Sequence, residues 1–73
     1  MTNNNYFQTD NGKVLIIASC PEFKGIVQPM QLFIVIEDEN DKGKYQVYNF
    51  KKEQCEELME QMKHAVGLVN CFG

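Results

Sequence analysis

The chain has 73 residues, a formal net charge of −3 and three cysteines, and all seven of its basic residues are lysine. A chain of this length forms a single domain, 1–73, whose folding buries only about 60% of the unfolded surface. The absence of arginine, whose planar guanidinium reads guanine and grips phosphate, weighs against nucleic acid as a partner.

Two strands are expected in the first third of the chain, at residues 5–9 and 13–20. The second is rich in β-branched residues and is followed by Pro21, which cannot donate to a continuing ladder. The pair Asn11-Gly12 favours positive φ at both central positions of a tight hairpin turn. The next segment, 21–29, contains two prolines and a glycine, and predicts a loop whose apolar residues pack back onto the sheet.

Residues 31–37 and 44–50 predict a second hairpin, which is apolar on both of its faces. Successive side chains of a strand point to opposite faces, so a single covering element leaves one apolar set in water. We therefore expect the sheet to take part in self-association. The residues predicted for self-association are Phe33, Val35, Tyr45 and Val47.

From Lys52 onward, apolar residues recur at intervals of three and four residues. This spacing predicts an amphipathic helix over 52–66. Gly67 fits a cap that ends this helix, and 68–73 forms an apolar tail. The predicted fold is therefore α+β, a four-stranded antiparallel β-meander with one C-terminal amphipathic helix packed on one face.

This fold has more apolar sheet surface than one helix can cover. Burying two or three more apolar side chains per chain contributes several kcal/mol, at about 25 cal/mol per Å². That contribution is comparable to the whole stability of a small domain, so a homodimer is expected. The alternative is that the loop 21–29 and the tail 68–73 cover the second face within one chain.

The cysteines Cys20, Cys55 and Cys71 are odd in number and form no disulfide framework, which indicates reduced thiols and a cytoplasmic location. Together with His64 they match the ligand count of a zinc site, but no two lie within four residues, so no metal is expected. Cys55 and His64 fall on opposite sides of the predicted helix, whereas a pairing of Cys71 with His64 stays open. We expect no catalytic residue, enzyme activity or cofactor.

The chain is also expected to have no membrane segment. Its longest apolar run, 32–36, is too short to cross a bilayer, and its N-terminus lacks the features of a signal peptide.

The favoured function is a small, non-catalytic, cytoplasmic protein that binds an unidentified protein target as an inhibitor or accessory regulator, of the kind found in phages, mobile elements and bacteria. The target would be bound through the sheet face or through an acidic surface, for which plain solubility is the simpler explanation. The acidic surface consists of Glu37, Asp38, Glu39, Asp41, Glu53, Glu56, Glu57 and Glu60.

The layout of four strands and one helix resembles the dimeric single-stranded DNA-binding domains of the PC4-like coactivator family. The resemblance lies in topology and implies an alternative function, the binding of single-stranded nucleic acid by a dimer. Bases would then stack on aromatic side chains beside lysines. The candidate residues are Tyr6, Phe7, Tyr45 and Tyr48 with Lys13, Lys42 and Lys44.

Overall fold

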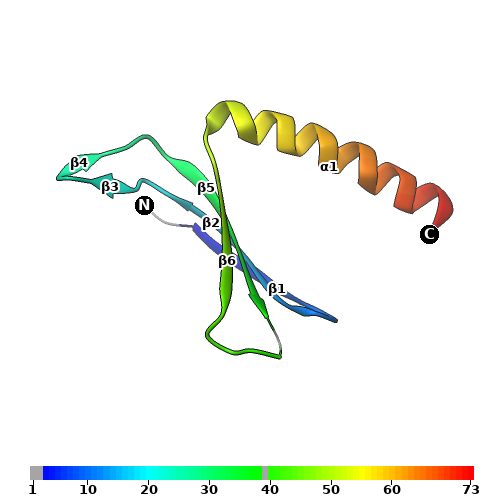
Figure 1. The fold of residues 1–73 in the computed structure, drawn as a ribbon. Coiled ribbons are helices and arrows are strands. Elements are labelled where there is room, and N and C mark those ends of the chain that lie inside the picture. The colour runs from blue at the N-terminus through cyan, green and yellow to red at the C-terminus, as the bar shows by residue number, and fades with distance from the viewer. Residues whose placement is uncertain (1–2, 39) are drawn as a thin grey trace.

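The computed structural model describes residues 3–38 and 40–73, with side chains for 5–38 and 40–73. In this part of the chain a four-stranded antiparallel sheet in the order β1-β2-β5-β6 is followed by one helix (Figure 1). The predicted α+β class, the meander and the C-terminal helix are confirmed. The elements are β1 (Asn3–Thr9), β2 (Gly12–Ser19), β3 (Glu22–Phe23), β4 (Ile26–Val27), β5 (Gln31–Asp38), β6 (Tyr45–Phe50) and α1 (Lys52–Phe72).

The turn between β1 and β2 differs by one residue from the predicted one. Thr9 pairs with Gly12, so Asp10 and Asn11 occupy the central positions. The Thr9 hydroxyl accepts the Asn11 N–H at 3.2 Å and donates to the Gly12 carbonyl at 2.7 Å. This threonine closes the turn by side-chain hydrogen bonds, and neither central residue has positive φ.

The segment predicted as a packed loop, 21–29, forms a small hairpin instead. Phe23 pairs with Ile26 across a two-residue turn in which Lys24 and Gly25 both have positive φ, 53° and 78°. Positive φ at both central residues is the geometry of a type I′ turn, which matches the twist of the flanking strands. The hairpin projects beyond the main sheet (Figure 1), and the side chains of Phe23, Ile26 and Val27 are 65% to 67% exposed. The prediction that these residues pack back onto the sheet is wrong.

Helix α1 is longer than the predicted 52–66, because it continues through Gly67 to Phe72. The predicted apolar tail 68–73 is therefore the last turn and a half of the helix, 68–72, followed by Gly73. A single glycine inside a helix costs only about 1 kcal/mol relative to alanine, and the residues after Gly67 keep the helical spacing of apolar side chains. The cap lies at Gly73, whose N–H donates to the Val69 carbonyl at 2.6 Å.

The contact between α1 and the sheet is confined to the start of the helix. Among the strands that the structure describes, the helix contacts β5 and β6 alone, and its half-buried residues are Cys55 and Leu58, in its first two turns. Beyond them α1 runs away from the sheet (Figure 1). The helix therefore covers less of a sheet face than its amphipathic pattern predicts.

The described part of the chain lacks a hydrophobic core, since no apolar side chain among residues 5–38 and 40–73 is buried. The radius of gyration is 14.5 Å, against about 11 Å for a compact domain of this length. The accessible surface is 6378 Å², whereas a compact protein of 8.5 kDa exposes about 4,700 Å². The chain thus exposes about 1,700 Å² more than a compact protein of its mass.

Candidate protein-interaction surfaces

The strand register divides the sheet side chains into two apolar faces, since residues paired across antiparallel strands lie on the same face. On one face, Ile34 of β5 pairs with Ile16 of β2 and with Tyr48 of β6. On the other face, Val35 of β5 pairs with Leu15 of β2 and with Val47 of β6. The first, called the helix-side face, consists of Phe7, Val14, Ile16, Ala18, Leu32, Ile34, Ile36, Tyr48 and Phe50. The second, called the open face, consists of Tyr6, Leu15, Ile17, Phe33, Val35, Tyr45 and Val47.

The open face brings together all four residues predicted for self-association. Val35 and Val47 form a direct cross-strand pair, with Phe33 and Tyr45 two residues away along their strands. Tyr45 is 54% and Val47 59% exposed, while the two residues from β5 are half-buried. A contiguous apolar surface of this kind is typical of a protein-interaction site.

The helix-side face is touched by the start of α1. Ala18 and Leu32 from this face, together with Met30 and Cys55, line a shallow, mainly apolar hollow of about 430 Å³ at the corner between sheet and helix. The Cys55 thiol donates to the Phe50 carbonyl at 3.6 Å, which holds the first turn of α1 near the end of β6. The centre and far end of this face stay uncovered.

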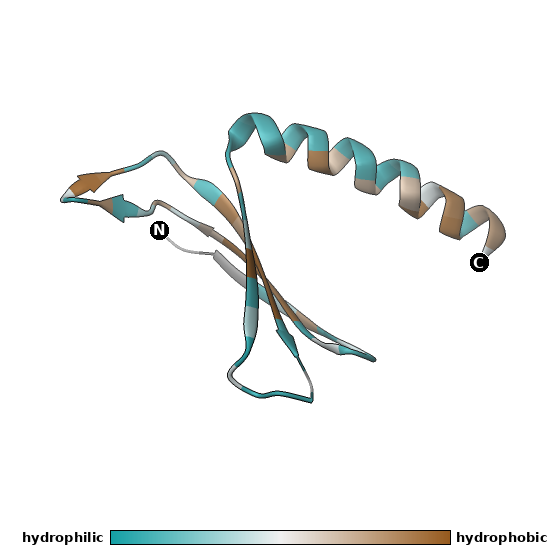
Figure 2. Ribbon diagram, in the orientation of Figure 1, coloured by the Kyte–Doolittle hydropathy of each residue, from teal (hydrophilic) through white to brown (hydrophobic). Residues whose placement is uncertain are grey.

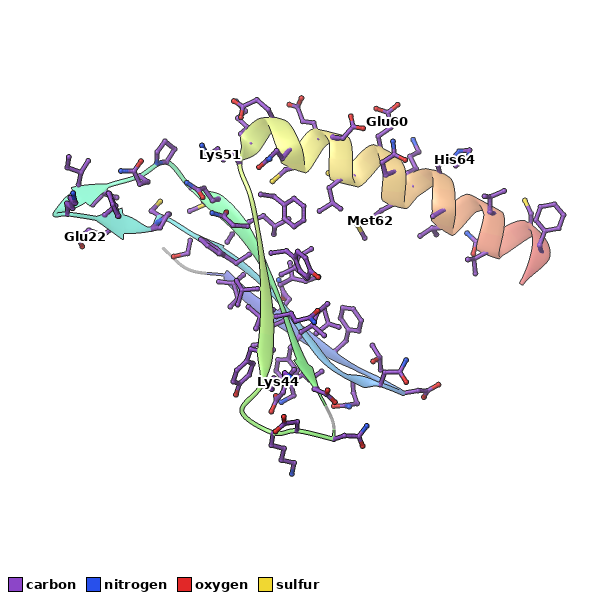
Figure 3. All side chains as sticks on the ribbon, viewed as in Figure 1. Glu22, Lys44, Lys51, Glu60, Met62 and His64 are labelled. Carbon is purple, nitrogen blue, oxygen red and sulfur yellow. The ribbon has the colours of Figure 1, made fainter. Side chains whose placement is uncertain are left out.

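Helix α1 carries an apolar stripe along its whole length, and hydrophobic residues recur along one side of it (Figure 2). Met62, which belongs to the stripe, points toward the side where the sheet lies, whereas Glu60 and His64 point away from it (Figure 3). The stripe consists of Cys55, Leu58, Met59, Met62, Ala65, Val66, Val69 and Phe72. Phe72 was predicted as part of the apolar tail 68–73 and not of the helix, although its spacing from Val69 and Ala65 signals the continuing helical period.

The acidic residues predicted as one surface form two separate groups. Glu37, Asp38 and Asp41 lie at the tip of the β5–β6 hairpin, whereas the glutamates of α1 follow the other end of β6. The strand between them is six residues long, or about 20 Å. Glu39 lies outside the described residues. The helical group, Glu53, Glu56, Glu57 and Glu60, is exposed on the outer side of α1, away from the apolar stripe.

The cysteines do not gather with the histidine. Cys20 and Cys71 are exposed free thiols and Cys55 is a half-buried one. His64 and Cys71 lie on the same side of α1 but are two turns apart, which separates them by about 10 Å along the axis. That spacing is too long for a hydrogen-bonded thiol and base. Among the described residues, no group of three or more histidine, cysteine, aspartate and glutamate side chains could hold a metal ion.

The aromatic residues considered for base stacking are split between the two faces of the sheet. Tyr6 and Tyr45 belong to the open face, and Phe7 and Tyr48 to the helix-side face. Lys13 places its Nζ 4.8 Å from the centre of the Tyr6 ring, a cation–π contact. The other candidate lysines, Lys42 and Lys44, lie between β5 and β6, at the acidic tip of that hairpin. The register thus provides no single aromatic platform flanked by lysines.

In the described part of the chain, no helix is long and apolar enough to cross a membrane. Comparison of the chain with protein-family models, curated proteins and solved structures finds no match.

Proposed function

We propose that this protein is a small, non-catalytic protein-interaction domain that works as a homodimer in the cytoplasm. The observation that carries the proposal is the lack of any buried apolar side chain among residues 5–38 and 40–73. Hydrophobic burial is the main favourable term in folding, so a domain with this surface needs another chain to complete its core. The free thiols are those of a protein in a reducing compartment.

The dimer acts as an inhibitor or accessory regulator by binding a protein target. Two surfaces are offered for that contact: the open face of the sheet and the outer side of α1 with Glu53, Glu56, Glu57 and Glu60. The four carboxylates and the net charge of −3 favour a target with a basic surface. Because these glutamates lie opposite the apolar stripe, they stay accessible when the stripe is buried.

The homodimer is tested by light scattering coupled to gel filtration at micromolar concentration. The expected mass is twice the chain mass of 8.5 kDa. A mass equal to that of one chain, in a sample with a folded circular dichroism spectrum, overturns the proposal.

The two target-binding surfaces are tested by affinity capture from the host with three matched variants. Val35→Lys places a charge in the open face, E56K/E60K reverses two charges on the outer side of α1, and Asn70→Lys adds a positive charge elsewhere on the helix. We expect one of the first two variants to lose a protein that wild type and Asn70→Lys retain. Equal capture by all four proteins contradicts the assignment of both surfaces.

A second candidate is the binding of single-stranded nucleic acid, favoured by the contact of Lys13 with the exposed Tyr6 ring. The split of the aromatic residues between the faces makes it the weaker of the two. Fluorescence titration with an oligo-dT strand at low and high salt separates them. Tight binding that weakens steeply with salt supports the nucleic-acid role, and its absence supports the protein-binding role.

A further inference from the structure

The connection between β6 and α1 is very short, and beyond it the helix runs away from its own sheet (Figure 1). The strand ends at Phe50 and the helix starts at Lys52, which leaves Lys51 as the only linking residue. The Lys51 N–H donates to Gln54 Oε1 at 2.9 Å, and the Cys55 N–H donates to the Lys51 carbonyl at 2.9 Å. These bonds tie Lys51 to the first helical turn as its N-cap. The extended backbone of Lys51, at φ −75° and ψ 169°, sets the direction in which α1 leaves the sheet.

The outward direction leaves most of the apolar stripe in water. Cys55 and Leu58 are half-buried, whereas the large apolar residues of the stripe beyond them are exposed, from 51% at Met62 to 85% at Phe72. The segment from Met59 to Phe72 is about 21 Å long, at 1.5 Å per residue. To bury the exposed stripe residues, another apolar surface must extend over a similar length.

The helix-side face offers a cover of that size. Its four strands, spaced about 4.8 Å apart, make a layer about 19 Å wide, close to the length of the exposed part of the helix. Its central residues Ile16, Ile34 and Tyr48 are apolar and carry no charge. The stripe is also uncharged, so both surfaces meet without burying an unpaired ion.

We propose that two copies of the chain exchange helices, with α1 of each copy lying across the helix-side face of the other. This inference rests on the homodimer proposed above and names its interface. The exchange buries the apolar stripe and the helix-side face in one assembly, whereas pairing through Phe33, Val35, Tyr45 and Val47 leaves the stripe in water. A one-residue hinge that keeps an element away from its own domain is also the geometry that favours exchange between copies.

The area available agrees with such an interface. Covering the excess of about 1,700 Å² on each protomer buries about 3,400 Å² in the dimer. Obligate homodimers bury about 2,000 to 5,000 Å². The open face and the glutamates on the outer side of α1 stay free in this arrangement, so the target keeps both of its proposed contact surfaces.

The test uses two charge variants that are complementary only between chains. Ile34→Lys charges the centre of the helix-side face, and Met62→Glu charges the middle of the stripe. Each variant alone places a lone charge in both copies of the interface, so we expect its dimer to be weakened at least 100-fold. A mixture of the two, refolded together, forms a heterodimer with one wild-type contact and one contact between opposite charges. The expected result is recovery of the dimer mass and of the helical circular dichroism signal in the mixture.

Val35→Lys on the open face is the matched control, since it adds the same charge to the same strand on the other side. It is expected to keep the wild-type dimer mass. If the wild type is a dimer and the mixture recovers nothing, the exchange is refuted while the homodimer stands. If Val35→Lys alone dissociates the dimer, the interface is the open face. A monomeric wild type overturns both the exchange and the homodimer.

Discussion

Folding and association are expected to be a single transition, and the thermal midpoint should therefore depend on protein concentration. No apolar side chain among residues 5–38 and 40–73 is buried within one chain. The isolated chain buries only about half of the roughly 12,300 Å² that its unfolded form exposes, less than the 60% typical of small domains. Raising the concentration shifts the equilibrium toward the folded dimer by mass action, so the midpoint rises.

The size of the rise follows from the entropy of unfolding. At about 2.1 cal/mol/K per residue, two chains of 73 residues unfold with an entropy of about 0.3 kcal/mol/K. A tenfold change in concentration is worth about 1.4 kcal/mol. The midpoint should therefore rise by about 5 °C for each tenfold increase in concentration, or about 10 °C between 1 and 100 μM.

The assay is circular dichroism at 222 nm, heated at three concentrations, with the mass measured by light scattering at each starting condition. Reversibility is checked by a second scan of the same sample. A midpoint constant within 1 °C over the full range refutes the reasoning, because it shows that one chain supplies its own stability. A midpoint that falls with concentration, together with loss of signal on the second scan, indicates aggregation.

Three further predictions concern local structure, each measured as the change in unfolding free energy at one fixed protein concentration. Thr9→Val removes the hydroxyl that closes the β1–β2 turn and should destabilise by about 1 kcal/mol, with Asp10→Ala, next to it in the turn, as the control. Gly25→Ala should destabilise by about 1 kcal/mol because Gly25 has φ +78°, whereas Gly67→Ala should stabilise by up to about 1 kcal/mol because Gly67 is helical; neither new methyl group meets an atom within 4 Å. Equal signs for the two glycine variants contradict the backbone explanation. Lys51→Ser supplies the missing side-chain cap of α1 and should stabilise by about 1 kcal/mol, visible as a higher midpoint; an unchanged midpoint contradicts this role of residue 51.

Periodicity in the sequence was sufficient to predict the main elements. Alternation over 31–37 and the β-branched run 13–20 predict the strands that become β5 and β2, within one residue at each end. The period of three and four residues predicts α1, since this spacing is set by the geometry of the helix itself. These predictions agree with the structure because the periods of strands and helices depend on residues that are close together in the sequence.

The errors arise where a weak local signal competes with its surroundings. Gly67 resembles a helix cap, but residues beyond it keep the apolar spacing, and the helix continues. The two prolines of 21–29 indicate a loop, yet Lys24 and Gly25 between them form the turn of a hairpin. Asn11-Gly12 is a strong turn signal, but the Thr9 hydroxyl shifts the turn by one residue.

The candidate surfaces could be predicted only in part. Alternation correctly groups Phe33 with Val35 and Tyr45 with Val47, because side-chain direction follows from the strand. The direction in which α1 leaves the sheet depends on the backbone angles of Lys51, which composition and period do not encode. The separation of the acidic residues into two groups also follows from three-dimensional placement, since β6 places them at opposite ends.

The lack of a hydrophobic core within one chain, among the described residues, has a consequence for how the amount of folded protein depends on expression. If two copies must meet before either is stable, the amount of folded product at low expression grows with the square of the amount synthesised. At low expression, chains that have not yet paired would stay unfolded, and cellular proteases would degrade them before they encounter a target. A modest increase in transcription then produces a sharp onset of activity, without any separate regulatory ligand.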